Sequence, residues 1–398
     1  MSRDASAPIL WALMIGNLVI GTGVMVVPGT LNDISQSLGI SVPQAGQLIT
    51  AAAILMGLGA PLFAGLVAGW DRRRLLTGSL IWYGLLHAAC ALAPNYATLM
   101  PLRVLAVISP AVFTPQAAAC VGLLVPPEQR GRGITFVFLG WSVASVMGMP
   151  LAAWIGGAWG WRWAFGLVAV SAWLVSLWVW RAMPDGVRPA ALSREAWGRT
   201  LGSAPLMMAV GVTLLSAFSQ FTLFSYFAPY FAQTHGLNGA GLSLLFLWFG
   251  AFGLLGNVLV SRSIDRIGAP RAVLITLSLI ALTLLLWPLG RASVWLQALV
   301  LVPWALGCFS ANSAQQARLV HLSPALAPAT VALNSSAMYS GQALGAALGG
   351  LMIAQGHMLS LHTVGLVVAA TAIALSVWAG GVSRPAPAAQ VAPPGPST

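Results

Sequence analysis

The chain has 398 residues, of which 58% are hydrophobic and only 6% charged, and its mean hydropathy is +0.86. Soluble domains carry roughly a quarter charged residues, so this composition excludes an ordinary soluble protein and indicates one that folds in lipid. The formal net charge is +11, but all the basic residues are Arg and they fall in short loops between apolar segments, which excludes a nucleic-acid-binding face.

Apolar runs long enough to cross a bilayer follow one another along the chain. A bilayer core needs about 20 apolar residues per helix, and on this basis the sequence predicts twelve transmembrane helices. The first run is longer than the apolar region of a cleaved signal peptide, so we expect it to remain as the first helix. The twelve predicted spans are 9–31, 44–69, 75–94, 97–124, 134–157, 163–182, 204–233, 241–261, 272–290, 295–318, 329–353 and 363–381.

One long polar interval, 183–203, divides the predicted spans into two sets of six. We therefore expect an N-terminal bundle at 1–182, a cytoplasmic linker at 183–203 and a C-terminal bundle at 204–382. The tail at 383–398 is rich in Pro and Ala and is expected to be disordered. Nearly all loop arginines fall on one side of this topology, and Arg-rich loops stay in the cytoplasm, so both termini are expected to be cytoplasmic.

The two predicted bundles carry similar features. Gly65 and Ser261 each begin a short charged segment at the end of a span, with an offset of 261 − 65 = 196 residues, close to half the chain. At that offset the fifth span overlays the eleventh, and both are rich in small residues that let helices pack closely in lipid. The expected packing residues are Gly148, Pro150, Gly341, Gly345 and Gly349, and close packing alone, without a role in export, is the alternative.

At these residues the chain resembles the major facilitator superfamily, over nearly its whole length. Within it, the chain is similar to the twelve-helix drug:proton antiporter group and to arabinose and sugar efflux permeases. The residues that match the family's loop motif, its intramembrane arginine and its fifth-span glycine motif are Gly65, Val67, Arg73, Arg74, Asp265, Arg266, Gly268, Arg103, Gly140, Gly148, Pro150, Gly156 and Gly157. The chain departs from the pattern where Gly69 takes the acidic position and Met149 interrupts the usual Gly-Pro pair. The resemblance implies an all-α fold of two six-helix bundles.

The charged segments between spans two and three and between spans eight and nine are candidate gates. Asp71, Arg73, Asp265 and Arg266 can form charge-assisted contacts with a neighbouring helix terminus, and such contacts shift a conformational equilibrium only if they form in one state. The alternative interpretation is that these arginines only fix the topology.

Few ionisable groups lie within the predicted spans, where they are costly and mark functional positions. The candidates for coupling transport to protons are Asp33 near the outer end of the first span, His87 in the third and Arg103 in the fourth. The alternatives are a cap or loop residue for Asp33, a packing histidine for His87, and for Arg103 a side chain that reaches the interface.

A substrate site is expected near mid-membrane between the bundles, lined by polar and aromatic side chains. The candidate substrate-binding residues are Asn17, Gln116, Gln220, Tyr226, Asn312, Gln315 and Asn334. The alternative for each of them is a helix–helix hydrogen bond.

The sequence therefore predicts export of a drug, sugar or metabolite by alternating access, with protons as the coupling ion, in the inner membrane of a bacterium. Uptake, facilitated permeation and ligand sensing remain open. The histidines are scattered and the cysteines Cys90, Cys120 and Cys308 lack metal or disulfide spacing, so we expect no enzyme activity, metal or cofactor. We expect a monomer whose partners are its substrate and the bilayer.

Overall fold

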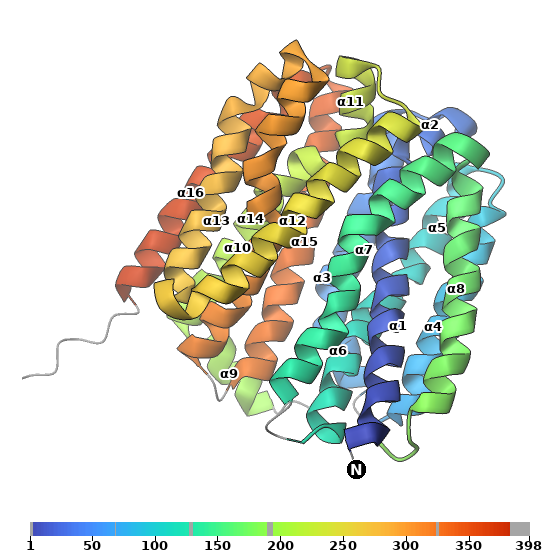
Figure 1. Ribbon diagram of the computed structural model, residues 1–398, viewed down its shortest axis with the longest axis vertical. Helices are drawn as coiled ribbons and strands as arrows, with labels where there is room; N and C mark the ends of the chain where they lie inside the picture. The colour runs from blue at the N-terminus through green and yellow to red at the C-terminus, as the bar shows by residue number, and fades with distance from the viewer. Residues whose placement is uncertain (1–2, 68, 127–129, 189–193, 324–325, 383–398) are drawn as a thin grey trace, which may run out of the picture.

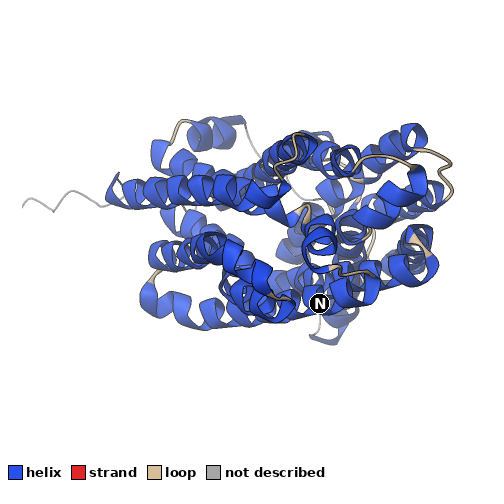
Figure 2. Ribbon diagram, turned by 90° about the horizontal axis from the view of Figure 1, so that it is seen from above, coloured by secondary structure: helices blue, strands red, loops and turns tan. Residues whose placement is uncertain are grey.

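The computed structural model describes residues 3–67, 69–126, 130–188, 194–323 and 326–382, which are helices and short connections with no strand among them (Figures 1 and 2). The predicted tail at 383–398 lies outside the described residues. The helices are α1 (Arg3–Gly29), α2 (Leu31–Leu38), α3 (Val42–Leu66), α4 (Arg72–Ala91), α5 (Tyr96–Ala106), α6 (Ile108–Leu124), α7 (Arg130–Trp159), α8 (Trp161–Ala182), α9 (Arg194–Leu201), α10 (Ala204–Phe224), α11 (Phe227–His235), α12 (Gly239–Ile267), α13 (Ala269–Leu286), α14 (Val294–Leu322), α15 (Ala327–Ala354) and α16 (Leu361–Val382), with the 3-10 helices η2 (Trp287–Ala292) and η4 (Met358–Ser360).

Each predicted span coincides with a helix or a pair of consecutive helices. In the described chain, ten candidate spans are long and apolar enough to cross a membrane when α5–α6 and α10–α11 are each taken together. The two long helices outside this set are α4 and α15. α4 begins with three arginines, and α15 contains many glycines together with serines and an asparagine, so both are less hydropathic than the ten candidate spans. The structure confirms an all-α membrane protein.

Two predicted spans, 97–124 and 204–233, are wrong as single helices. The first breaks between α5 and α6 at Val107, and the second breaks between α10 and α11 at Ser225 and Tyr226. The same physical reason explains both breaks, because a proline ring collides with the carbonyl four residues earlier. Pro110 and Pro229 are each the third residue of the new helix, so the carbonyls they exclude belong to Ala106, the last residue of α5, and to Ser225, in the second break.

The helices form two groups that correspond to the halves of the chain. In Figure 1, α1 to α8 form one group and α10 to α16 the other, and the groups converge toward the end that carries α2 and α11. We call this the α2–α11 end. Toward the opposite end, which carries the N-terminus, the groups diverge (Figure 1). Helix pairs α3–α15 and α7–α12 make the main contacts between the groups.

Glycine contacts repeat between the halves. A Cβ added to Gly148 of α7 would lie 3.2 Å from the Cα of Thr22 in α1, and one added to Gly349 of α15 would lie 2.4 Å from the carbonyl oxygen of Thr222 in α10. The two glycines are 349 − 148 = 201 residues apart, and α4 and α13 begin at residues 269 − 72 = 197 apart. The duplicated packing therefore follows an offset close to that predicted, and connections of different length change it slightly.

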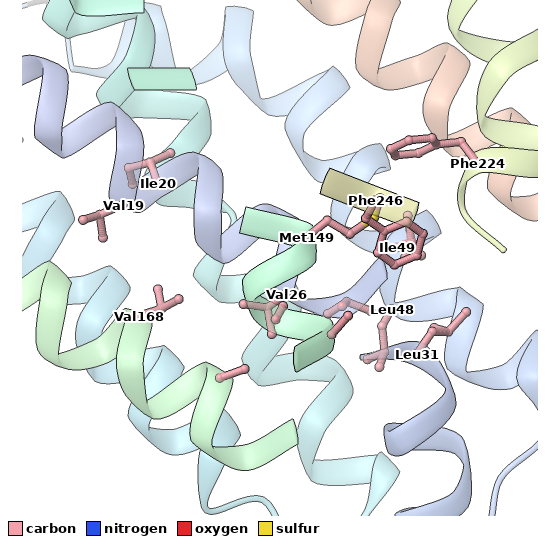
Figure 3. Packing of buried hydrophobic residues seen from close by; sticks show 14 of the residues in the cluster. Val19, Ile20, Val26, Leu31, Leu48, Ile49, Met149, Val168, Phe224 and Phe246 are labelled. Atoms are coloured by element: carbon pink, nitrogen blue, oxygen red, sulfur yellow. The ribbon is translucent and has the colours of Figure 1, made fainter. Parts of the chain in front are cut away.

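A buried apolar core continues across the contact between the groups. Figure 3 shows Met149 of α7 beside Phe246 of α12 and Ile49 of α3, with Phe224 of α10 nearby. All four side chains are at least nine-tenths buried. Closing the α2–α11 end therefore removes apolar surface of both halves from solvent.

Candidate functional site

Arg103 lies enclosed between helices and does not reach the membrane surface. Its side chain is 2% exposed, so the interpretation as an arginine that extends to the interface is wrong. Its guanidinium donates hydrogen bonds to the carbonyl oxygens of Gly23 (3.0 Å) and Val24 (3.2 Å) in α1. The ion pairs found between described side chains do not include Arg103. A buried cation without a carboxylate partner is costly, so this position remains a candidate for a functional role.

His87 and Tyr83, one turn apart on α4, face the same stretch of α1 as Arg103. His87 is fully buried, and its Nδ1 lies 2.9 Å from the carbonyl oxygen of Tyr83, so this nitrogen carries the proton and donates. The Tyr83 hydroxyl donates to the carbonyl oxygen of Ile20 at 2.9 Å. Gly23 leaves the space for both rings, because a Cβ there would lie 2.3 Å from the Tyr83 hydroxyl and 2.8 Å from His87 Nε2. The structure brings two of the three coupling candidates together.

In the N-terminal half, the predicted substrate residue Asn17 belongs to a polar chain between helices. Its Nδ2 donates to the carbonyl oxygen of Val137 at 3.1 Å, and its Oδ1 accepts from the Thr114 hydroxyl at 2.9 Å. The same hydroxyl accepts from Trp141 Nε1 at 2.9 Å. Asn17 is fully buried, whereas Thr114 and Trp141 are partly exposed, so they carry the polar chain to an accessible surface. Gln116, two residues after Thr114 on α6, is also buried.

The C-terminal half contains a second polar chain with three of the predicted residues. Asn334 accepts from the Thr213 hydroxyl at 2.5 Å and donates to Asn312 Oδ1 at 3.0 Å. Gln315 donates to the carbonyl oxygen of Ala209 at 2.6 Å and to Thr213 at 3.2 Å. This chain joins α10, α14 and α15, and Asn312 is its partly exposed member.

The remaining two predicted substrate residues are enclosed near the break between α10 and α11. Gln220 accepts from Trp304 Nε1 at 3.0 Å, and the Tyr226 hydroxyl donates to the carbonyl oxygen of Ala346 at 2.7 Å. Gly46 and Gly350 leave room for the Tyr226 ring between α3 and α15. In this conformation both side chains bind other helices.

The gating candidates Asp71 and Arg73 contact the chain around the end of α8. Arg73 donates to the carbonyl oxygen of Trp180 at 2.7 Å and to Asp185 Oδ2 at 2.8 Å, and its guanidinium lies 4.2 Å from the Trp180 ring centroid. Asp71 caps α4 by accepting from the backbone N–H of Arg74 at 3.1 Å, and its other oxygen accepts from the N–H of Gly186 at 2.7 Å. Slight burial raises the pKa of Asp71, but these backbone hydrogen bonds outweigh it and the pKa is lowered. Arg73 therefore contacts the last turn of α8 within the N-terminal half, and the gating role of both residues stays a prediction.

The corresponding segment of the second half is less fully described. Arg266 is an exposed residue in the last turn of α12. The side chain of Asp265 lies outside the described part of the structure, so its predicted gating role stays a prediction.

Asp33 lies on a helix that the sequence analysis did not separate from the first span. It stands in the first turn of α2, where the helix dipole favours a carboxylate. It is half-buried, and burial raises its pKa above the ordinary value. It lines a cavity of about 510 Å³ between the halves, together with residues of α1, α7, α11 and α12.

Sequence reasoning missed the serines that join the halves. The Ser243 hydroxyl of α12 donates to the carbonyl oxygen of Pro150 in α7 at 2.9 Å, and the Ser336 hydroxyl of α15 donates to the carbonyl oxygen of Gly57 in α3. A serine within an apolar helix gives no signal of its partner. Arg318, the last residue of the predicted span 295–318, is 2% exposed and donates to the hydroxyl and carbonyl oxygens of Ser376 in α16.

Comparisons with known proteins agree with this architecture. The model of the Major Facilitator Superfamily matches residues 13–325 and again residues 209–397. The inner membrane transport protein YdhP of Escherichia coli (strain K12) is 30% identical over 375 residues, covering 92% of this chain and 94% of that protein. A chloramphenicol resistance protein of Streptomyces lividans is 31% identical over 398 residues, covering 95% and 98%. A probable sugar efflux transporter of Pasteurella multocida (strain Pm70) is 27% identical over 320 residues, covering 80% and 79%.

The fold also matches solved structures. The crystal structure of a bacterial homolog to the human lysosomal transporter Spinster, in an inward-facing and occupied conformation, superposes with a TM-score of 0.73 at 19% identity, covering 98% of this chain and 100% of that one. The family match over most of the chain and the relatives that span its length agree with the helical architecture. The chain belongs to the major facilitator superfamily, a family of membrane transporters and not of enzymes.

Proposed function

We propose that the protein exports a small organic molecule, such as a drug, a sugar or a metabolite, across the inner membrane of a bacterium in exchange for protons. Family membership supports transport, and relatives named for chloramphenicol resistance and sugar efflux support the outward direction. The relative named as an inner membrane transport protein supports the location.

The contacts between the halves support alternating access, and this is the observation that carries the proposal. Between α7 and α12, they run from Gly157 against Gly239, through Pro150 and Ser243, to Val146 against Gly250. Between α3 and α15, they run from Pro43 near Gly350 to Gly57 at Ser336. These contacts start at the α2–α11 end and reach about the middle of the helices, beyond which the two groups diverge (Figure 1). We assign the α2–α11 end to the outside, so this conformer is closed to the outside and faces inward.

The two polar chains support a substrate site at mid-membrane. Asn17 with Thr114 in one half and Asn334 with Asn312 in the other are held by neighbouring helices, and each chain ends in a partly exposed side chain. Bound substrate competes for the exposed members, while the buried amides hold them in position. Such a site suits a small molecule with both polar and apolar surface.

The buried cluster around Arg103 supports a role in coupling. Arg103 holds two carbonyls of α1, and His87 lies against the same turn of that helix. A proton that enters this cluster adds charge beside a buried guanidinium, which favours a shift of α1. Asp33 remains the candidate for exchange with the outside.

The cytoplasmic loop supports motion of the two bundles as units. Arg73 and Asp71 form hydrogen bonds with residues 185 and 186. The start of the linker at 183–203 is therefore expected to move together with the proposed bundle at 1–182. The remaining linker and α9 then absorb the motion of the bundle at 204–382.

The test is transport in everted vesicles and in proteoliposomes, with a panel of drugs, sugars and metabolites and an imposed pH gradient. Accumulation in everted vesicles that requires the gradient supports proton-coupled export. Entry that stops at equal concentrations and needs no ion gradient supports a facilitative permease, and accumulation in right-side-out vesicles supports uptake. Binding without flux under any ion gradient would contradict transport.

A further inference from the structure

The cavity at the α2–α11 end contains, beside the proton-exchange candidate Asp33, polar and aromatic side chains that the proposed transport cycle does not use. It opens to the surface beside exposed side chains of Gln36 and Trp154, and Asn238 lines it on the opposite side. Asn238 is the residue before α12, and its side chain makes no cap hydrogen bond to that helix. Its amide is therefore available to an occupant of the cavity.

Asp33 gives the cavity its charge, as the single charged side chain among the described residues that line it. The carboxylate is fixed against α7, where a Cβ on Gly156 would lie 2.5 Å from Asp33 Oδ2. Neither ion pair between described side chains includes it. Arg162, in the first turn of α8, donates instead to the Ser37 hydroxyl and to the carbonyl oxygen of Ala93.

Helix ends contribute little net potential to the cavity. The carboxyl ends of α1, α7 and α11 all contribute lining residues, among them Gly29, Ala158 and Ala232, and the amino ends of α2 and α12 contribute the others. Carboxyl ends carry partial negative charge and amino ends partial positive charge, so their contributions largely offset each other and the charge of Asp33 remains. Trp154 adds an aromatic face, which also attracts cations.

The walls belong to different halves. Asp33, Gln36 and Trp154 come from the N-terminal half, and Asn238 and Leu242 come from the C-terminal half. Opening the α2–α11 end would separate these walls and remove the site. An occupant therefore binds one conformer and stabilises it.

We propose that this cavity is a binding site for a small organic cation with an apolar body, which enters from the α2–α11 end and holds that end closed. Asp33 is the counter-ion, Trp154 contacts the apolar body, and Asn238 completes the site from the other half. The part of the inference that concerns closure rests on the proposed alternating-access function, whereas binding does not.

Binding is tested on the purified full chain with two probes of similar shape and opposite charge, tetraphenylphosphonium and tetraphenylborate. We expect the cation to bind and the anion not to bind. Asp33→Asn is expected to weaken binding of the cation about tenfold or more, as for loss of a charged partner. Glu195→Gln is the matched control, because Glu195 is exposed on α9 and far along the chain from the cavity.

Trp154→Leu is a second variant on an exposed position, and it is expected to weaken binding several-fold without loss of folding. Absence of cation binding, equal binding of both probes, or equal cation binding by Asp33→Asn and the wild type would each overturn the proposal. None of these results depends on whether transport is observed.

Closure is tested with Met149→Cys, since Met149 is buried at the contact between the halves (Figure 3). The rate at which a maleimide modifies this cysteine reports opening of the α2–α11 end. Tetraphenylphosphonium is expected to slow modification, and Asp33→Asn is expected to abolish the effect. An unchanged rate at saturating cation would refute closure while the binding result stands on its own.

Discussion

Gly157 and Gly239 bring the backbones of α7 and α12 into direct contact at the α2–α11 end. A Cβ on Gly157 would lie 2.7 Å from the Cα of Gly239, and a Cβ on Gly239 would lie 2.8 Å from the Cα of Gly157. Because backbone atoms cannot rotate away, Gly157→Ala must move the two helices apart. Overpacking of this kind costs about 1–3 kcal/mol, which lowers the ratio of closed to open molecules about 5- to 150-fold.

The assay measures the distance between two spin labels, one on Ala97→Cys of α5 and one on Gln233→Cys of α11. Both positions are exposed and lie at the α2–α11 end, one in each half. Gly157→Ala is expected to shift the distance distribution toward longer values. Gly166→Ala on α8 is the matched control, because its Cβ would meet open space. If Gly157→Ala leaves the distribution of the wild type unchanged, the glycine contact does not hold this end closed and the reasoning is refuted.

Three further predictions concern the site and the packing around it. Arg103→Ala removes two hydrogen bonds from a charged group to α1, each worth about 1.5–3 kcal/mol. We expect it to abolish flux in everted vesicles, while immunoblots show normal insertion into the membrane. Unchanged flux would contradict the coupling role. Gly148→Leu places a large side chain where even a Cβ would lie 3.2 Å from Thr22 Cα, so flux should be lost, and full activity would remove α7 from the mechanism. The pKa of Asp33 is raised from 3.8 by burial, so its ionised form opposes folding at pH 7 and the penalty disappears as pH falls below the ordinary value. Asp33→Asn should therefore melt at a temperature equal to or higher than that of the wild type at pH 7, and the difference should shrink toward acid pH. A lower melting temperature of the variant at pH 7 would show that the carboxylate stabilises the fold.

Hydropathy along the chain was sufficient to predict the helical architecture, because each span must satisfy its own backbone hydrogen bonds in lipid. It did not predict which spans break. Pro150 and Pro303 lie inside continuous helices, whereas α6 and α11 start just before Pro110 and Pro229. A proline removes one backbone hydrogen bond in every case, and the surrounding helices decide whether the chain stays helical.

The candidate site was only partly predictable, for a related reason. Arg103 was identifiable because a charge within a span is rare and costly. Its partners on α1 were not, since backbone carbonyls carry no sequence signal. The same limit applies to Ser243 and Ser336, whose acceptors are also carbonyls. Contacts to the backbone appear only when the helices are placed in space.

The contact between the halves depends on shape and hydroxyl groups more than on charge. The ion pairs between described side chains, Arg73–Asp185 and Arg199–Glu195, do not join a helix of one half to a helix of the other. A contact of this kind is sensitive to small displacements, because a gap of about 0.5–1 Å already removes a quarter to a half of the attraction between packed atoms. A signal from a buried charge must then reach the contact through packed helices.

One continuous route of this kind runs through α1 and α7. Arg103 holds the carbonyls of Gly23 and Val24, and the adjacent Thr22 packs against Gly148. Two residues further along α7, the carbonyl oxygen of Pro150 accepts a hydrogen bond from the Ser243 hydroxyl across the contact between the halves. A shift of α1 caused by a change of charge near Arg103 would thus displace the part of α7 that closes the α2–α11 end. We infer that Arg103→Ala weakens the response of the spin-label distance to pH as well as the flux, whereas Gly157→Ala changes the distance at every pH.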